Sequence, residues 1–174
     1  MKAWVTGGGG MMGQHLVRLL IDKGYTVLAT DYHPTTDIQQ LPREAIFEEC
    51  DMRNRSLVKK FLKDFKPNEV YHLAAQSYPS VSWDDPWYTL ETNVLGSVNL
   101  FEAVKELQEK IQFHTKIFNA CTSAEYGYVS EDQVPVKEVM PLKPLHPYGV
   151  SKLAQEALAY QYCKNFGLHI ISFR

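Results

Sequence analysis

Two kinds of hydrophobic pattern alternate along the chain. Short, nearly continuous apolar runs are typical of strands buried in a parallel sheet, and longer stretches with apolar residues three or four apart are typical of helices. The short runs predict six strands, at residues Lys2–Thr6, Tyr25–Thr30, Ala45–Glu49, Val70–Ala74, Lys116–Cys121 and Leu168–Phe173. The longer stretches predict four helices, at residues Met11–Lys23, Arg55–Phe65, Pro86–Leu107 and Pro147–Asn165.

This alternation predicts an α/β fold. Successive strand–helix–strand units give a parallel sheet, because each helix returns the chain to the edge where the next strand begins. Right-handed crossovers then place helices on both faces. We therefore expect residues 1–174 to form a single doubly wound, mostly parallel Rossmann sheet. Since the sequence stops on its sixth predicted strand, we also expect that a substrate-binding domain is absent from it.

Composition and charge exclude several classes of protein. The chain is 45% hydrophobic and 22% charged, as in globular domains, and its net charge of −2 offers no basic surface for nucleic acid or anionic membranes. No apolar run approaches the ~18 residues of a membrane span. The cysteines Cys50, Cys121 and Cys163 are too far apart in sequence to suggest a disulfide framework or a metal site. We expect a cytoplasmic protein that binds no metal.

A glycine-rich segment joins the first predicted strand to the first predicted helix. Gly7, Gly10 and Gly13 have the GxxGxxG spacing. Such glycines permit a tight turn and a close approach of the backbone to a pyrophosphate, and the helix N-terminus offers N–H groups to the phosphates. A plain loop is the alternative. A P-loop is excluded, because no Gly-Lys-Ser/Thr sequence follows.

An acidic residue closes the second predicted strand. Asp31 lies 21 residues after Gly10, where a carboxylate accepts hydrogen bonds from the adenosine ribose of a dinucleotide. A carboxylate at this position repels a 2′-phosphate, and no arginine is adjacent in the sequence. NAD is therefore expected in preference to NADP, although an ordinary turn acid would show the same spacing.

Three side chains are candidates for acid–base chemistry. Tyr148 and Lys152 are four residues apart at the start of the last predicted helix, so they share one face. An ammonium beside a phenol lowers the pKa of that phenol and favours proton exchange with a substrate hydroxyl. The third candidate is the hydroxyl of Thr122 or of its neighbour Ser123, after the fifth predicted strand at the sheet edge where ligands bind, which could hydrogen-bond the reacting oxygen. A helix-surface pair and a strand-end cap are the respective alternatives.

Together these segments resemble the extended short-chain dehydrogenase/reductase family of nucleotide-sugar epimerases, reductases and dehydratases. The motifs that carry the resemblance are Val5–Gly13, Asp31, Asp51–Arg53, His72–Ser77, Asn93–Gly96, Thr122–Gly127 and Pro147–Lys152. Among them, His72–Ser77 is most similar to the branch of GDP-mannose 4,6-dehydratases and GDP-4-keto-6-deoxymannose reductases. The resemblance implies an NAD-dependent enzyme that transfers a hydride from C4 of a nucleotide-sugar, with a GDP-sugar as the expected substrate.

The resemblance also implies two sets of site residues. The catalytic set is Thr122, which orients the sugar hydroxyl, Tyr148, the acid/base, and Lys152, which binds the nicotinamide ribose. The cofactor-binding set runs from the pyrophosphate to the nicotinamide and consists of Gly7, Gly10, Met11, Met12, Gly13, Asp31, Asp51, Met52, Leu73, Ala74, Ala75, Asn93, Tyr148 and Lys152. In this set Asp51 and Met52 flank the adenine, and Asn93 steadies the active site.

One departure from the family bears on the reaction. The dehydratases have an acid two residues after the catalytic threonine, where this chain has Ala124, and Glu125 follows one residue later. A shift of one residue on an extended segment turns a side chain the other way. We therefore expect an epimerase or a reductase. The alternative is a local bulge that brings Glu125 into the site of a dehydratase.

Two other functions remain open at this stage. The chain could be a non-catalytic module for dinucleotide binding or dimerisation, or a Rossmann domain for another nucleotide such as a methyl-donor cofactor. The Tyr–Lys pair favours the enzyme, since neither alternative uses it. The apolar stripes of the helices near residues 86–107 and 147–165 predict a homodimer, which the resemblance also implies.

Overall fold

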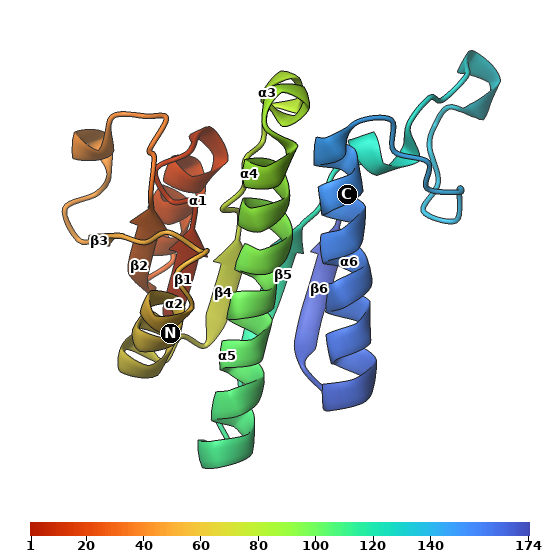
Figure 1. Ribbon diagram of the computed structural model, residues 1–174. Helices are drawn as coiled ribbons and strands as arrows, with labels where there is room; N and C mark the ends of the chain where they lie inside the picture. The colour runs from red at the N-terminus through yellow and green to blue at the C-terminus, as the bar shows by residue number, and fades with distance from the viewer.

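Six parallel strands form one sheet in the order β3-β2-β1-β4-β5-β6, as the computed structural model of residues 1–174 shows (Figure 1). The strands are β1 (Lys2–Thr6), β2 (Thr26–Asp31), β3 (Ile46–Glu49), β4 (Glu69–His72), β5 (Lys116–Ala120) and β6 (His169–Phe173). The predicted Rossmann sheet is confirmed, with strand limits moved by one or two residues. The strand order reverses between β1 and β4, which is the point where open α/β sheets bind ligands.

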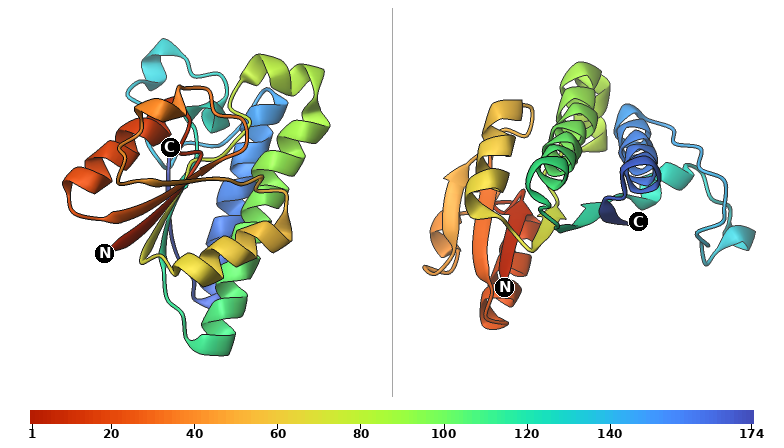
Figure 2. Two further views of the ribbon diagram at one scale, coloured as in Figure 1. Left: turned by 90° about the vertical axis from the view of Figure 1, so that its left-hand side faces the viewer. Right: turned by 90° about the horizontal axis from the view of Figure 1, so that it is seen from below.

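Helices cover the two faces of the sheet unequally. They are α1 (Met11–Asp22), α2 (Arg55–Phe65), α3 (Pro79–Asp84), α4 (Pro86–Leu90), α5 (Gly96–Ile111) and α6 (Pro147–Phe166). α2, α5 and α6 lie side by side on one face, and α1 lies on the opposite face over β1 and β2 (Figure 2). No helix is both long enough and apolar enough to cross a membrane.

The predicted single helix at Pro86–Leu107 is interrupted. α4 begins after Asp85, whose Oδ1 accepts a hydrogen bond from Tyr88 N at 2.9 Å. A π-helical turn, Glu91–Leu95, then precedes α5. The wider turn accommodates an extra residue and directs the Asn93 side chain into the protein, where it is 1% exposed. Apolar periodicity could not show this break, because the apolar stripe continues through it.

The hydrophobic core has two parts, because successive strand residues point to opposite faces. On β1, Trp4 belongs to the larger cluster, which lies among α2, α5 and α6, and Val5 belongs to the smaller cluster under α1. Both side chains are completely buried. This core holds the carboxyl ends of the strands in fixed positions, and the candidate site lies there.

Candidate active site

A cavity of about 530 Å³ lies at the carboxyl ends of the strands, from β1 to β5. Its wall brings together these predicted residues: Gly7, Gly10, Met11, Met12, Gly13, Asp31, Asp51, Met52, Leu73, Ala74, Ala75, Tyr148 and Lys152. Asn93 and Thr122 do not line it. Lining residues that the sequence analysis missed include Tyr32, Tyr88, Thr92 and Cys121. Tyr32 and Cys121 are chain neighbours of Asp31 and Thr122, whereas Tyr88 and Thr92 reach the cavity only through the fold.

The turn between β1 and α1 is built for backbone contact with a ligand. Gly7 has a φ of +72°, and a Cβ added there would lie 2.8 Å from Ala74 N. A Cβ on Gly13 would lie 2.1 Å from Gly7 O. Gly10 is the N-cap of α1 and provides no side-chain cap, so the first N–H groups of the helix remain available to an anion. The turn therefore fits a pyrophosphate.

Asp31 stands at the cavity wall with its carboxylate held by the backbone. Oδ2 accepts a hydrogen bond from Gly9 N at 3.0 Å. Oδ1 accepts from Tyr32 N at 2.8 Å and from His33 N at 3.2 Å. A carboxylate offers roughly four lone-pair sites, so these three bonds leave capacity for a ribose hydroxyl. The side chain is at once a turn acid and an available acceptor for a ligand.

Asp51 lines the cavity with its carboxylate paired to Arg53, and its expected contact with the adenine stays a prediction. Arg53 Nη2 lies 2.7 Å from Asp51 Oδ2, and Arg53 Nε donates to both carboxylate oxygens. Burial by itself raises the pKa of Asp51, but the hydrogen bonds and the charge of Arg53 together hold that pKa below its usual value. The guanidinium also lies 4.9 Å from the Tyr88 ring and 5.9 Å from the Tyr32 ring. Asp51 thus orients Arg53 at the cavity rim.

Tyr148 and Lys152 lie in the first turns of α6, as their spacing predicts. His146 caps the helix by accepting a hydrogen bond from Gly149 N at 3.0 Å, and Pro147 occupies the first helical position. Lys152 is 2% exposed, and its Nζ donates to Ala120 O and to Gln155 Oε1, each at 3.0 Å. An ammonium has three donors, so one remains for a ligand in the cavity. Burial lowers the pKa of Lys152 to about 8.

The expected lowering of the Tyr148 pKa by Lys152 is wrong for this structure. Burial raises the pKa of Tyr148, a hydrogen bond with the Thr122 side chain opposes that rise, and the charge of Glu125 adds to it. The Lys152 ammonium is directed to Ala120 O and the Gln155 side chain, and Lys152 is not among the groups that shift the pKa of Tyr148. Tyr148 is therefore a neutral phenol that can both donate and accept a hydrogen bond.

Thr122 and Glu125 cap a short helical turn after β5, at Ser123–Tyr126. Thr122 Oγ1 accepts a hydrogen bond from Ala124 N, and Glu125 Oε1 accepts from Thr122 N, both at 3.2 Å. Glu125 is completely buried and does not line the cavity. The bulge that would bring Glu125 into the cavity is not observed. Glu125 belongs instead to a cluster with Cys121 and Glu156. The Cys121 Sγ and one carboxylate oxygen of each glutamate lie within 4.8 Å of one another.

A chain of buried hydrogen bonds begins beside the glycine turn. Thr6 Oγ1 accepts from Ala74 N at 3.2 Å and donates to His72 Nδ1 at 2.9 Å. His72 Nε2 then donates to Ser97 Oγ at 3.0 Å, because the Ser97 hydroxyl is committed to Asn93 O at 2.6 Å. Burial lowers the pKa of His72 to about 3, so the ring is neutral.

Asn93 extends this chain to α6. Its Oδ1 accepts from Gln76 N at 2.8 Å, and its Nδ2 donates to Gln76 O at 3.0 Å and to Ser151 Oγ at 2.9 Å. The Ser151 hydroxyl donates to Tyr148 O at 2.7 Å. Asn93 therefore braces the turn that carries Tyr148, at a distance from the cavity wall. Polar residues inside apolar runs, such as His72 and Ser97, were the available sequence signal.

A Rossmann sheet with a glycine turn at one end of its cavity and a Tyr–Lys pair at the other defines an extended short-chain dehydrogenase/reductase domain. The chain belongs to the GDP-mannose 4,6 dehydratase family, whose sequence model matches residues 4–174.

Two comparisons illustrate the relationship. The chain is 32% identical to a GDP-mannose 4,6-dehydratase from Vibrio cholerae over 179 residues, which cover 97% of this chain and 47% of the relative. It is 34% identical to the UDP-glucose 4-epimerase of Thermus thermophilus, solved in complex with NAD, with a TM-score of 0.91 over all of this chain and 54% of that one. The chain thus spans about half the length of the proteins it matches.

Proposed function

We propose that this chain is the NAD-binding half of an enzyme that modifies a nucleotide-sugar by hydride transfer at C4. The observation that carries the proposal is the single cavity that joins the glycine turn to Tyr148 and Lys152. The α1 N-terminus binds the pyrophosphate, and Asp31 accepts from the adenosine ribose. The free N–H donor of Lys152 binds the nicotinamide ribose. When bound, NAD supplies the hydride acceptor, and Tyr148 takes the proton of the sugar C4 hydroxyl.

The proposal favours NAD over NADP. The Asp31 carboxylate at the ribose position would repel a 2′-phosphate. Arg53 lies near this end of the cavity, but Asp51 and Glu91 engage it, at 2.7 Å and 3.8 Å. It is therefore not free to neutralise that phosphate.

Within this chemistry we favour an epimerase or a 4-keto reductase over a 4,6-dehydratase, with a GDP-sugar as substrate. Loss of water from a 4-keto sugar needs a second acid or base beside the phenol. The only carboxylates on the cavity wall are Asp31 and Asp51, both toward the predicted adenosine end, and Glu125 faces the interior. The GDP-mannose enzymes among the relatives are the support for the guanine nucleotide.

Cofactor binding tests the proposal directly. We expect the purified chain to bind NADH at least tenfold more tightly than NADPH, measured by nicotinamide fluorescence. Asp31→Asn should reduce this preference, because the amide loses the charge that repels the 2′-phosphate. Asp22→Ala, at an exposed carboxylate on α1, is the matched control. No binding of NADH at millimolar concentration would contradict the proposed function.

The substrate-binding domain is proposed to lie outside this chain and to pack on the sheet face opposite α5 and α6. On that face Tyr71 and Phe118 stack with ring centroids 4.7 Å apart. Ile171 and Phe173 on β6 are each 43% exposed. No helix covers this part of the sheet (Figure 2). A contiguous apolar surface of this kind is typical of an interface.

We propose the cytoplasm as the compartment, since all three cysteines are free.

We also propose a homodimer through α5 and α6. The two helices lie side by side on one face (Figure 1). α6 exposes Val150, which is 47% accessible, and Tyr160, which is 66% accessible. We expect sedimentation to show a dimer at micromolar concentration. Tyr160→Glu should raise the Kd of the dimer by about tenfold, which corresponds to roughly the 1.4 kcal/mol of a partly buried aromatic contact. Val139→Glu, on a loop away from both helices, should not, and a wild-type monomer would contradict the proposed dimer.

A further inference from the structure

Behind the reaction end of the cavity lies a buried acidic cluster that the proposed reaction does not use. Glu125 is 0% exposed; its Oε1 accepts from Thr122 N, and its Oε2 has no hydrogen-bond donor. Atoms of Cys121 and Glu156 lie within 4.8 Å of the Glu125 carboxyl. Arg174 Nε is 3.6 Å from Glu125 Oε2, beyond hydrogen-bond distance. A buried carboxylate oxygen without a donor favours protonation of Glu125.

Arg174 does not neutralise both carboxyl groups. Its Nε and Nη2 donate to the two oxygens of Glu156, at 2.8 Å and 2.5 Å, and its Nη1 donates to the Tyr126 hydroxyl at 2.8 Å. These hydrogen bonds lower the pKa of Glu156. Burial and the neighbouring Glu156 raise the pKa of Glu125 to about 7, against the Thr122 N–H and Arg174. The shared proton therefore resides on Glu125.

We propose that Glu125 is a positioning residue for Thr122 and Tyr148, and that it fills this role as a neutral acid that donates its proton to Glu156. Neutral Glu125 keeps both of its contacts: Oε1 accepts from Thr122 N, and Oε2 donates to Glu156. The Thr122 side chain in turn lies beside the Tyr148 hydroxyl and lowers the pKa of that phenol. The proposal rests on the proposed role of Tyr148 as the acid/base.

The charge of Glu125 directly affects the pKa of the Tyr148 phenol. The titratable and charged groups that face Glu125 are Cys121 after β5, Tyr148, Lys152 and Glu156 on α6, and Arg174 after β6, which also binds the Tyr126 hydroxyl. An ionised Glu125 raises the pKa of Tyr148. As a neutral acid, Glu125 leaves Tyr148 the more readily ionised. The site is then best prepared for proton transfer below the pH at which Glu125 ionises.

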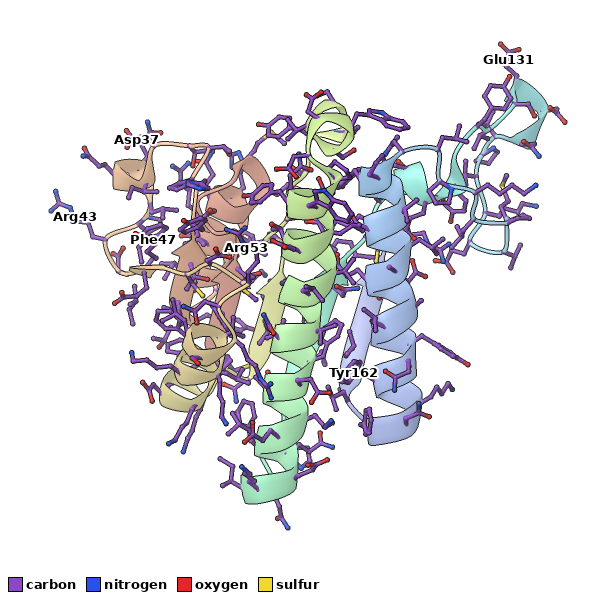
Figure 3. The ribbon with its side chains drawn as sticks, in the orientation of Figure 1. Asp37, Arg43, Phe47, Arg53, Glu131 and Tyr162 are labelled. Atoms are coloured by element: carbon purple, nitrogen blue, oxygen red, sulfur yellow. The ribbon has the colours of Figure 1, made fainter.

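The test is a titration of the Tyr148 ring by NMR with ¹³C at Cζ, on the whole chain, with Tyr148→Phe to assign the signal. In the wild type we expect a first inflection near neutral pH, which reports ionisation of Glu125. Glu125→Gln retains the acceptor for Thr122 N and a donor to Glu156 but carries no charge. It should abolish that inflection and lower the apparent pKa of Tyr148. Glu131→Gln, on an exposed turn, is the control and should change neither (Figure 3).

Persistence of the neutral inflection in Glu125→Gln would overturn the proposal. A second measurement covers a variant that fails to fold: the ¹³C titration of the Glu125 carboxyl in the wild type, which overturns it if the midpoint lies near the ordinary value of about 4.3. A stability profile gives a third readout. The folded state holds a proton that the unfolded chain releases above about pH 4.3, so this stabilisation is lost between about pH 4.3 and the folded pKa of about 7, with no further loss above it. In Glu125→Gln this pH-dependent decrease in the free energy of unfolding should be absent. None of these readouts needs NADH, so they stand apart from the proposed function.

Discussion

Replacing Gly13 with alanine should abolish NADH binding and destabilise the fold. The new Cβ would lie 2.1 Å from Gly7 O and 2.7 Å from Gly8 Cα, and neither is the end of a flexible side chain. The turn between β1 and α1 must therefore open. Overpacking of a tight site costs about 1–3 kcal/mol and sometimes more. We expect a loss of about 3 kcal/mol in the free energy of unfolding, measured with urea, and a Kd for NADH increased by roughly 100-fold or more.

Two substitutions separate the role of this turn from a general effect on α1. His15→Ala, on the exposed face of the same helix, should change neither quantity. Gly10→Ala should have an intermediate effect, since its Cβ would lie 3.2 Å from Gly7 O and its φ of −83° suits any residue. Wild-type affinity of Gly13→Ala for NADH would show that the dinucleotide does not lie on this turn.

Replacing Tyr148 with phenylalanine should remove turnover while leaving cofactor binding intact. The ring keeps its packing in the first turn of α6, but the hydroxyl that exchanges the C4 proton is lost. General acid–base catalysis contributes roughly 10²- to 10⁴-fold, so kcat on the nucleotide-sugar should fall by that factor. The Kd for NADH should stay within about twofold, because the proposed binding mode places the phosphates on the glycine turn and the riboses against Asp31 and Lys152. Turnover is measured in the full-length enzyme proposed to contain this chain.

The matched control is Tyr160→Phe on the same helix, at a tyrosine that is 66% exposed. It should retain full turnover. A Tyr148→Phe enzyme with nearly normal kcat would remove the acid/base assignment and would leave the dinucleotide-binding module as the better description of this chain.

Much of the site followed from local rules of chain geometry. Gly7 and Gly13 are needed where the backbone turns sharply and where a Cβ would collide with a carbonyl, and such positions are recognisable as glycine spacing. Tyr148 and Lys152 share a face because an α-helix places residues four apart together. Periodicity likewise predicted all six strands of the sheet. These features depend on neighbours within a few residues.

Contacts between distant segments were not predictable in the same way. Arg53 pairs with Asp51 two residues away, but its further contacts with the Tyr88 ring and Glu91 come from another part of the chain. The π turn at Glu91–Leu95 forms because Asn93 finds partners on other segments. In both cases, side-chain patterns along the chain are compatible with several arrangements, and only packing selects one.

Sequence patterns were enough to predict the six strands, three of the helices, the glycine turn between β1 and α1, and the Tyr–Lys pair. Each arises from backbone sterics or helix periodicity over a short span. The tertiary structure alone decided that Glu125 faces inward onto Glu156 and Arg174, and that burial raises the pKa of Tyr148. The physical reason is that burial and electrostatic fields depend on which remote segments exclude water from a group, and the fold brings those segments together.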